Sequence, residues 1–169
     1  EPTLNSYREM LKDGSVVRAL RFSAVLTVLF TMVAMVLTTA LAYPRTRPEL
    51  KGRGFFTTMI LVTMYFSGGV LPLYILIKSL GLLNTVWSLV LPLAISPFNV
   101  FIMRTSLQSI PESHTESALI DGASYFTILR KVILPLSLPI IATLSLFYAV
   151  GRWNTFQDAL YYITKQAMY

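Results

Sequence analysis

The chain has 169 residues, of which 54% are hydrophobic and only 13% charged, and its net charge is +6 at pH 7. Soluble domains carry about 25% charged residues, so this composition indicates a protein that is solvated by lipid. The lack of cysteine excludes a disulfide scaffold, a cysteine-ligated zinc site and thiol catalysis, and no nucleic-acid motif accompanies the positive charge.

The first two predicted membrane spans cover residues 22–43 and residues 55–76. The first span is uncharged and stops at Pro44, because proline disfavours helix in the residue before it. The second contains Ser67-Gly68-Gly69 and Pro72, which predict a break in the helix. Since broken backbone exposes unpaired polar groups, we expect this break to face other helices or a cavity.

Two more spans are predicted at residues 86–103 and 132–150. Pro92 and Pro97 are expected to kink the third span. Pro135 and Pro139 lie in the first turns of the fourth, where proline is tolerated best. The sequence Arg152-Trp153-Asn154 ends the fourth span, with the tryptophan as an interfacial anchor.

The distribution of basic residues predicts the orientation of the spans. Two loops, at residues 44–54 and 104–131, are separated by two spans and both contain arginine and lysine, which places them in the cytoplasm. The basic residues before the first span disagree with this orientation, since they would lie outside: Arg8, Lys12, Arg18 and Arg21. This N-terminal segment is interpreted as an amphipathic helix along the membrane face.

The long cytoplasmic stretch between the third and fourth spans predicts two short helices. Ser109 and Glu112 have the spacing of a capping box at a helix start. Gly122 can take a positive φ and end that helix, and Ser124 can cap a second helix that runs to Lys131. The small Ala118 would permit close approach by a partner surface. These residues alone leave open whether the stretch is a docking element or a plain connecting helix.

This stretch also has a specific spacing: Glu116-Ser117-Ala118, three residues, Gly122, nine residues, then Val-Ile-Leu-Pro at residues 132–135. It resembles the EAA loop of the permeases of ATP-driven (ABC) importers, in which Glu-Ala-Ala, three residues, Gly, nine residues and Ile-x-Leu-Pro follow one another. Ser117 replaces the first alanine and Val132 replaces the isoleucine. The resemblance implies that the candidate ATPase-coupling residues are Glu116, Ser117, Ala118, Asp121, Gly122 and Ala123.

Residues 63–74, 79–85, 98–104 and 148–154 are similar to the carbohydrate permeases, in particular the maltose-type, LplC/YtcP-like group. This resemblance implies an all-α transmembrane helix bundle of the type I ABC-importer kind, with one permease domain over residues 1–169 and the coupling loop at residues 106–135. About four to five spans of a six-span subunit are expected here, in the plasma membrane of a bacterium. The chain is accordingly interpreted as a fragment.

The resemblance also implies that this chain acts together with partner proteins. The expected partners are a second permease subunit, two ATPase subunits and an extracytoplasmic solute-binding protein. The chain has no Gly-x-x-x-x-Gly-Lys-Ser/Thr loop, so ATP and Mg²⁺ are assigned to the ATPases. No catalytic residue, cofactor or metal is assigned to this chain, and its only histidine, His114, is interpreted as a surface residue. The transported solute is expected to be a carbohydrate, in particular an oligosaccharide. Importers of peptides or ions share the same loop, so only the resemblance outside the loop favours a sugar.

Four residues are candidates for the sugar path: Tyr65, Tyr74, Asn99 and Asn154. Sugars bind to aromatic faces and to polar groups that line a cavity. The alternative is that the tyrosines pack between helices and that Asn99 makes an interhelical hydrogen bond.

Two alternative functions are considered, and the first is an ABC-importer permease for a non-sugar solute. A secondary transporter is disfavoured, because the predicted spans contain none of the acidic residues that ion coupling usually needs.

Overall fold

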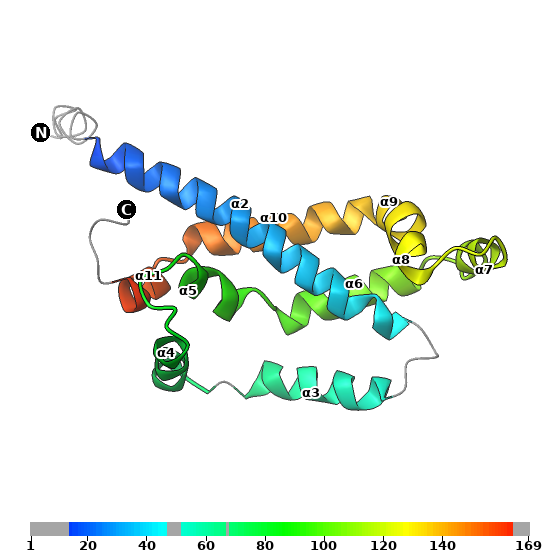
Figure 1. The fold of residues 1–169 in the computed structure, drawn as a ribbon, viewed down its shortest axis with the longest axis horizontal. Coiled ribbons are helices and arrows are strands. Elements are labelled where there is room, and N and C mark those ends of the chain that lie inside the picture. The colour runs from blue at the N-terminus through cyan, green and yellow to red at the C-terminus, as the bar shows by residue number, and fades with distance from the viewer. Residues whose placement is uncertain (1–13, 47–51, 67, 164–169) are drawn as a thin grey trace, which may run out of the picture.

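The computed structural model describes residues 14–46, 52–66 and 68–163, and every regular element within those ranges is a helix. The centre of the molecule consists of three helices that pack on one another, α2 (Ser15–Ala42), α6 (Pro97–Gln108) and α10 (Leu138–Asn154). Figure 1 shows α3 and α4 along one side of this bundle and α7 projecting from one end. The all-α prediction is therefore confirmed.

Helix α2 is uninterrupted over 28 residues, so it is about 42 Å long at 1.5 Å per residue. Its inward stripe repeats every four residues and is buried: Leu26, Phe30, Ala34 and Thr38. The opposite stripe is apolar and exposed: Val25, Val28, Met32 and Val36. A helix that is apolar on both faces is typical of a membrane span, with the exposed stripe facing lipid or other helices.

Helix α2 also corrects the interpretation of the basic N-terminal segment. Arg18 and Arg21 lie on α2 itself, so in the described residues this segment continues the span and does not form a separate amphipathic helix. Arg8 and Lys12 lie outside the described residues. The helix continues through Arg18 because no proline or glycine interrupts residues 15–42.

The second predicted span is broken where the sequence indicates. Helix α3 (Arg53–Tyr65) ends before Gly68, and α4 (Val70–Ser79) begins directly after Gly69, whose φ is 83°. An L-residue with a side chain rarely adopts that φ, so the glycine permits the change of direction. Residues 61–66 are exposed within the chain, and the expectation that the break faces a cavity or other helices stays a prediction.

The third predicted span is also divided. Helix α5 (Trp87–Val90) and the short 3-10 helix η2 (Leu91–Leu93) meet α6 at a bend of 58°. Pro97 is the first residue of α6, and the Ser96 side chain accepts a hydrogen bond from the Asn99 N–H at 3.4 Å. The predicted kink is thus confirmed, and the helix extends beyond Met103 to Gln108.

The fourth predicted span begins later than expected. Helices α8 (Tyr125–Ile128) and α9 (Leu134–Leu136) flank a π-helical stretch, η3 (Leu129–Ile133). This segment meets α10 at a bend of 81° next to Ser137. The straight part of the span therefore starts at Leu138 and not at Val132. Pro139, in the first turn of α10, cannot donate a backbone hydrogen bond to the preceding helix, which explains the break.

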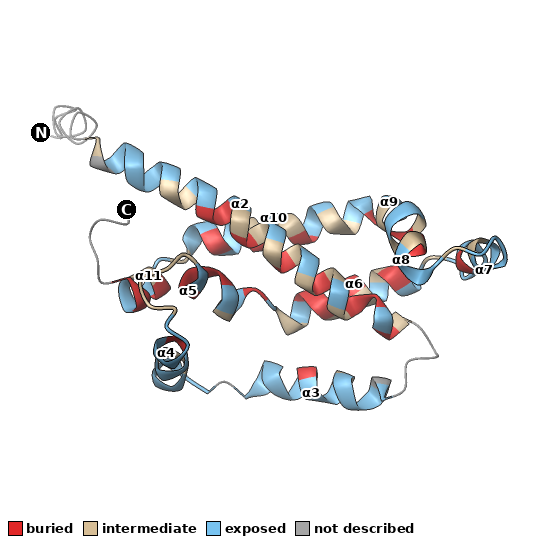
Figure 2. Cartoon of the chain, viewed as in Figure 1, coloured by how far each residue is buried: buried red, intermediate tan, exposed pale blue. Residues whose placement is uncertain are grey.

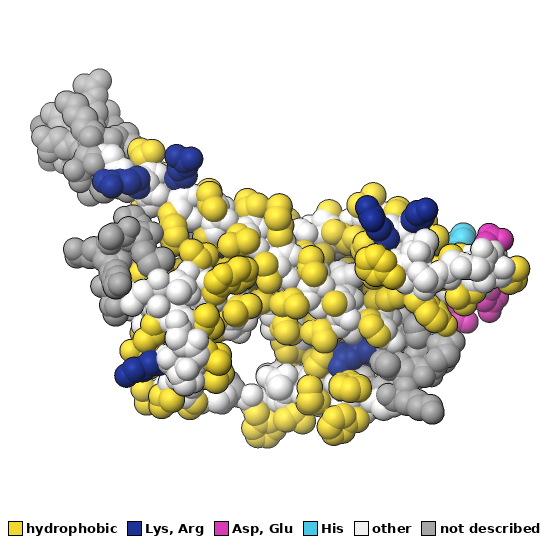
Figure 3. All heavy atoms as spheres, in the orientation of Figure 1, with side chains coloured by type: hydrophobic (Ala, Val, Ile, Leu, Met, Phe, Trp, Pro, Cys, Tyr) yellow, Lys and Arg dark blue, Asp and Glu magenta, His cyan; other side chains and the backbone are white. Residues whose placement is uncertain are grey.

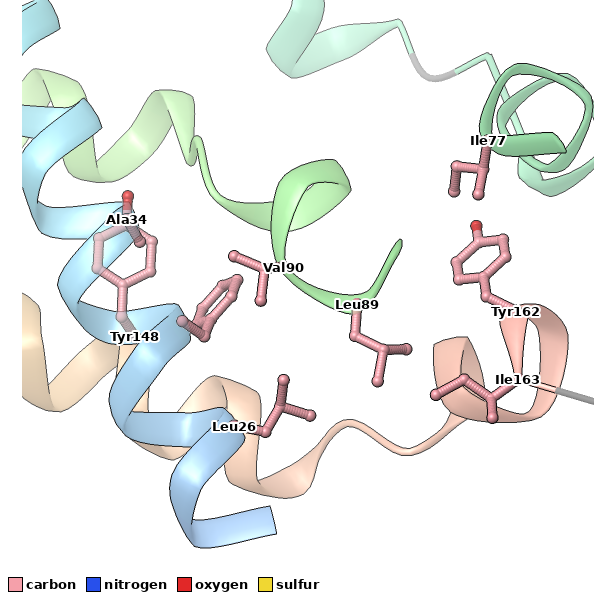
Figure 4. Packing of buried hydrophobic residues seen from close by; sticks show 9 residues of the cluster. Leu26, Ala34, Ile77, Leu89, Val90, Tyr148, Tyr162 and Ile163 are labelled. Carbon is pink, nitrogen blue, oxygen red and sulfur yellow. The ribbon is translucent and has the colours of Figure 1, made fainter. Parts of the chain in front are cut away.

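Two clusters of buried side chains hold the bundle together. One lies where α2 and α10 meet α5 and α11 (Gln157–Tyr162), and Figure 4 shows Leu26, Leu89, Val90 and Ile163 converging there. The other joins the far end of α2 to α6, α8 and α10, and its fully buried members include Met103, Ile128 and Leu144. Figure 2 shows that buried residues follow the facing sides of α2, α6 and α10, while α3 and α4 are largely exposed.

Among the residues that the structure describes, length and composition identify one helix that can cross a membrane by itself, residues 16–46, and up to four spans if each bent pair counts as one. The bundle has two distinct ends. The α7 end contains α7, α8 and the end of α6, which holds Arg104. The short 3-10 helix η1 (Pro44–Thr46), with Arg45, follows α2 there, and η3, with Arg130 and Lys131, follows α8. The opposite end contains α11, with Arg18, Arg21 and Lys78. Arg45 of the first basic loop thus shares one end with the basic residues of the second loop, in agreement with the parity of the spans.

Candidate functional site

The candidate site is the helix–turn–helix at the α7 end of the bundle. Helix α7 (Ser113–Ile120) is followed by Gly122, whose φ is 77°. The Gly122 N–H donates to the Leu119 carbonyl at 2.9 Å, and the Ala123 N–H donates to the Ala118 carbonyl at 2.9 Å. This pair of bonds is a Schellman motif. The predicted helix stop at Gly122 is confirmed, and the turn has a defined shape.

The second helix begins as predicted. The Ser124 hydroxyl accepts the Thr127 N–H at 3.3 Å and lies 2.9 Å from the Thr127 hydroxyl. Ser124 has an extended backbone, as expected of an N-cap residue. From this cap, α8 leads through η3 and α9 into α10.

The predicted capping box at the start of α7 is wrong. Ser109 is the C-cap residue of α6, and its hydroxyl donates to the Ser106 carbonyl at 2.7 Å. Glu112 stands directly before α7 without a side-chain capping bond. The backbone N–H groups of Thr115 and Glu116 instead bond to the Glu112 carbonyl, at 2.8 and 3.0 Å. A serine in the last turn of a helix can hydrogen-bond to a carbonyl of that helix three residues earlier. Its hydroxyl is then no longer available to cap the next helix.

The predicted coupling residues divide into two groups. Glu116, Ser117, Asp121 and Gly122 are exposed. Ala118 and Ala123 are half-buried and pack toward the buried cluster of α2, α6 and α10. Because Ala118 is small, α7 and its turn can lie close to the chain's own bundle. From the sequence, the same small side chain is expected to permit close approach by a partner protein. The exposed group is what a partner can reach.

Apolar side chains accompany these acidic ones. Ile120 is 86% exposed and Phe126 is 73% exposed, on either side of the glycine turn. Figure 3 shows that the acidic side chains gather at the outer tip of the molecule with apolar groups beside them. Sequence reasoning did not single out Ile120 or Phe126, because both fit the interior pattern of short amphipathic helices. Exposed large apolar side chains on a polar protrusion indicate an interaction surface.

The protrusion is anchored to the bundle. The Tyr43 hydroxyl at the end of α2 donates to the Tyr125 carbonyl at 3.2 Å. Ile128, one turn into α8, is fully buried in the second cluster. The start of α8 is therefore joined to the end of α2 by a hydrogen bond and to the cluster of α2, α6 and α10 by packed side chains.

The four candidate residues of the sugar path do not come together. Tyr65 is 79% exposed at the end of α3. The Tyr74 ring stacks on Tyr162, with centroids 6.4 Å apart. The Asn154 side chain donates to the Val150 carbonyl at 2.9 Å in its own helix. Asn99 is buried at the start of α6.

Asn99 lines a cavity of about 240 Å³ between α2, α6 and α10. The other residues with polar side chains in its lining are Ser96, Tyr148, Arg152 and Thr155. Of the four candidates, Asn99 is the one that lines this polar cavity. Among the described residues, no three potential metal ligands converge.

A buried ion pair closes the α11 end of the bundle. Arg152, at the end of α10, bonds to the Asp158 carboxylate through both terminal nitrogens, and it also donates to the Leu89 carbonyl at 3.1 Å. The guanidinium lies 5.8 Å from the centre of the Phe30 ring. Sequence analysis interpreted Arg152 as the end of a span. In the structure it also ties α10 and α11 to α5 and α2.

The chain is similar in sequence to membrane components of bacterial transport systems. The model of the family "Binding-protein-dependent transport system inner membrane component" matches residues 21–167. The Bacillus subtilis protein LplC is 43% identical over 165 residues, which are 98% of this chain and 56% of LplC. The B. subtilis polygalacturonan/rhamnogalacturonan transport system permease protein YtcP is 44% identical over 165 residues, or 98% of this chain and 58% of YtcP.

A solved structure shares the fold. It is the crystal structure of a bacterial ABC transporter involved in the import of the acidic polysaccharide alginate, with a TM-score of 0.77 and 32% sequence identity. The match covers 85% of this chain and 53% of that one. The chain thus spans about half the length of the relatives it matches, and the matched half includes both α7 and the membrane helices around it.

Proposed function

Because the chain belongs to the family of inner-membrane components of binding-protein-dependent transport systems, we propose that the full protein is the permease subunit of an ATP-driven carbohydrate importer. It crosses the plasma membrane of a bacterium several times. It opens alternately to the two sides while partner subunits hydrolyse ATP. The observation that carries this proposal is the α7–Gly122–α8 protrusion, which offers exposed acidic and apolar groups at one end of a membrane helix bundle.

The chemistry of the protrusion supports docking in a cleft of an ATPase subunit. Glu116 and Asp121 are exposed acids that can pair with basic or amide groups. Ile120 supplies a large apolar side chain that gains from burial. The Schellman turn fixes their mutual positions without help from a partner, so little conformational entropy is lost on docking.

The link from the protrusion to the membrane supports coupling. Helix α8, η3 and α9 form one segment that meets α10 at 81°. A displacement of α7 by a closing ATPase pair would act on this segment as on a lever, with the bend next to Ser137 as the hinge. The buried Ile128 and the Tyr43–Tyr125 hydrogen bond would carry the displacement into the bundle.

The proposed partner subunits are those of an ATP-driven importer. Two ATPase subunits would bind ATP and Mg²⁺ and supply the free energy. A second permease subunit would complete the path, and an extracytoplasmic binding protein would deliver the solute at the α11 end. The basic residues Arg45, Arg104, Arg130 and Lys131 at the α7 end support its placement in the cytoplasm.

The relatives support an oligosaccharide as the solute, since YtcP is a polygalacturonan/rhamnogalacturonan transport permease and the solved structure belongs to an importer of the acidic polysaccharide alginate. Within this chain, Asn99 is the best candidate contact, because it lines the polar cavity beside Tyr148 and Arg152. Tyr65 and Asn154 are exposed and would contact the sugar only where another subunit completes the path. Tyr74 would contribute through its stack on Tyr162.

The test is ATP-dependent uptake of labelled oligosaccharides by the full-length assembly in liposomes, with Glu116→Lys in this subunit. Loss of uptake and of substrate-stimulated ATP hydrolysis, with normal membrane insertion, is the expected result. Glu112→Lys is the matched control, because it makes the same charge change at an exposed residue before α7. ATP-dependent uptake that is equal in both variants and the wild type would refute the coupling role of α7. Absence of ATP-dependent uptake of any oligosaccharide by the wild type would refute the carbohydrate assignment.

A further inference from the structure

A second hollow lies on the outside of the bundle, between α2 and the segment from α8 to the start of α10. It is an open groove of about 610 Å³, a volume in the range that accommodates ligands of drug size. Val36 and Ala40 of α2 form one wall, and Phe126, Leu134 and Leu138 form part of the other. The bend next to Ser137 turns α9 away from α10 and helps to shape this groove.

The walls of the groove are apolar except for Thr39 of α2 and one cation, the Arg130 side chain on η3. Arg130 is exposed, and no hydrogen bond or ion pair is found for it among the described residues. Lys131 follows it, also exposed. An apolar groove with a cation at the α7 end is complementary to an amphiphile that has an acyl chain and an anionic head.

We propose that this groove binds one anionic glycerophospholipid of the cytoplasmic leaflet. An acyl chain lies between α2 and α9–α10, and the phosphate pairs with the Arg130 guanidinium. Basic pockets between membrane helices on the cytoplasmic side are suited to anionic headgroups. A helix from the rest of this protein or from another subunit would bury the same apolar walls, and that occupant is the competing outcome of the test. The cation at the end of the apolar walls favours a lipid, because one molecule supplies both the anionic group and the apolar chain.

The experiment is native mass spectrometry of the full-length assembly in detergent, titrated with phosphatidylglycerol or with phosphatidylcholine. Arg130→Gln removes the cation, and Lys78→Gln is its control, because Lys78 is an exposed cation at the opposite end of the bundle. Ala40→Trp fills the groove, and Ala142→Trp is its control, because Ala142 is an exposed α10 residue that does not line the groove.

Arg130→Gln is expected to weaken phosphatidylglycerol binding about fivefold, since each basic residue near an anionic lipid surface contributes on that scale. Ala40→Trp is expected to remove the bound lipid, while both controls bind as the wild type does. Equal affinity in Arg130→Gln and Lys78→Gln, or phosphatidylcholine binding as tight as that of phosphatidylglycerol, would overturn the proposal. So would a cross-link from Ala40→Cys to a helix from the rest of this protein or from another subunit. The count of bound lipids does not depend on transport, so this result is separate from that of the uptake assay.

Discussion

The hydroxyl group of Thr38 on α2 lies 2.7 Å from the hydroxyl group of Tyr148 on α10, in the buried centre of the bundle. The Tyr148 oxygen also accepts the N–H of Ser96 at 3.3 Å. One phenol therefore joins α2, α10 and the bend before α6, three segments that are distant in sequence. Because Tyr148 also lines the Asn99 cavity, this contact fixes the position of the cavity wall.

Replacement of Tyr148 by phenylalanine is expected to destabilise the assembly. The change leaves the Thr38 hydroxyl and the Ser96 N–H without this partner, while the ring and its edge contact with Phe30 remain. Hydrogen bonds between membrane helices contribute about 0.6 kcal/mol on average, so the loss of two predicts a cost of about 1 kcal/mol. Thermal unfolding in detergent measures it. Tyr161→Phe, at an exposed ring, should leave the melting temperature unchanged.

The Arg152–Asp158 pair leads to a stronger prediction. Both side chains are largely buried, at 3% and 11% exposure, so Asp158→Asn would leave a buried guanidinium without its counter-charge. Breaking a buried pair on one side costs about 3–5 kcal/mol, and the expected result is a large fall in the melting temperature. Asp121→Asn is the control, because it removes an exposed acid on the protrusion.

A double variant distinguishes the pair from general damage at this end of the bundle. Arg152→Met with Asp158→Leu removes both charges and keeps apolar volume, so it should recover much of the stability that Asp158→Asn loses. The single variants Arg152→Met and Asp158→Leu are measured beside it. If the loss of unfolding free energy in the double variant equals the sum of the losses in these two, the ion pair does not carry the stabilisation. The hydrogen bond from Arg152 to the Leu89 carbonyl would then carry it.

Local features of the fold could be predicted from the sequence, and distant pairings could not. Gly122 and Ser124 were correctly predicted as a helix stop and a helix start, because both act on backbone groups within five residues. Arg152 was interpreted only as the end of a span. Its contacts with Leu89 and Phe30 depend on how α10 lies against α5 and α2, which no spacing along the chain reveals.

The same limit explains the wrong capping box and the scattering of the sugar-path candidates. Ser109 and Glu112 have the spacing of a capping box, but α6 continues farther than expected and Ser109 belongs to its last turn. Sequence also grouped Tyr74 with Asn99 as possible sugar contacts on residue type alone. The structure stacks Tyr74 on Tyr162 and places Asn99 in the polar cavity, because helix faces are decided by packing.

Gly122 allows a test of the turn itself. A Cβ added there meets no atom within 4 Å, so the φ of +77° is the main obstacle to substitution. A non-glycine residue in this conformation costs about 1–2 kcal/mol, and less for asparagine. Gly122→Val is therefore expected to disorder the turn and reduce ATP-dependent uptake, whereas Gly122→Asn retains most of it.

The matched control for Gly122 is Gly54→Val, at a helical glycine of α3 that also has open space around it. That change should leave uptake unaffected. If Gly122→Val and Gly122→Asn reduce uptake equally, the loss comes from added bulk at the docking surface, and the conformation of the turn is not what matters.

Ile120 tests whether the protrusion docks through its apolar side chain. At 86% exposure it adds little to the stability of this chain, so Ile120→Ala should leave the melting temperature of the permease unchanged. Burial of such a side chain against an ATPase subunit contributes about 1.5–3 kcal/mol, and the variant is expected to weaken binding of the purified ATPase roughly tenfold or more. Surface plasmon resonance on the permease in nanodiscs measures this. Leu80→Ala is the control, since Leu80 is similarly exposed but follows α4 at the opposite end. An ATPase affinity that is equal in the two variants would mean that Ile120 faces solvent in the assembled transporter, and the acidic residues of α7 would then have to carry the docking.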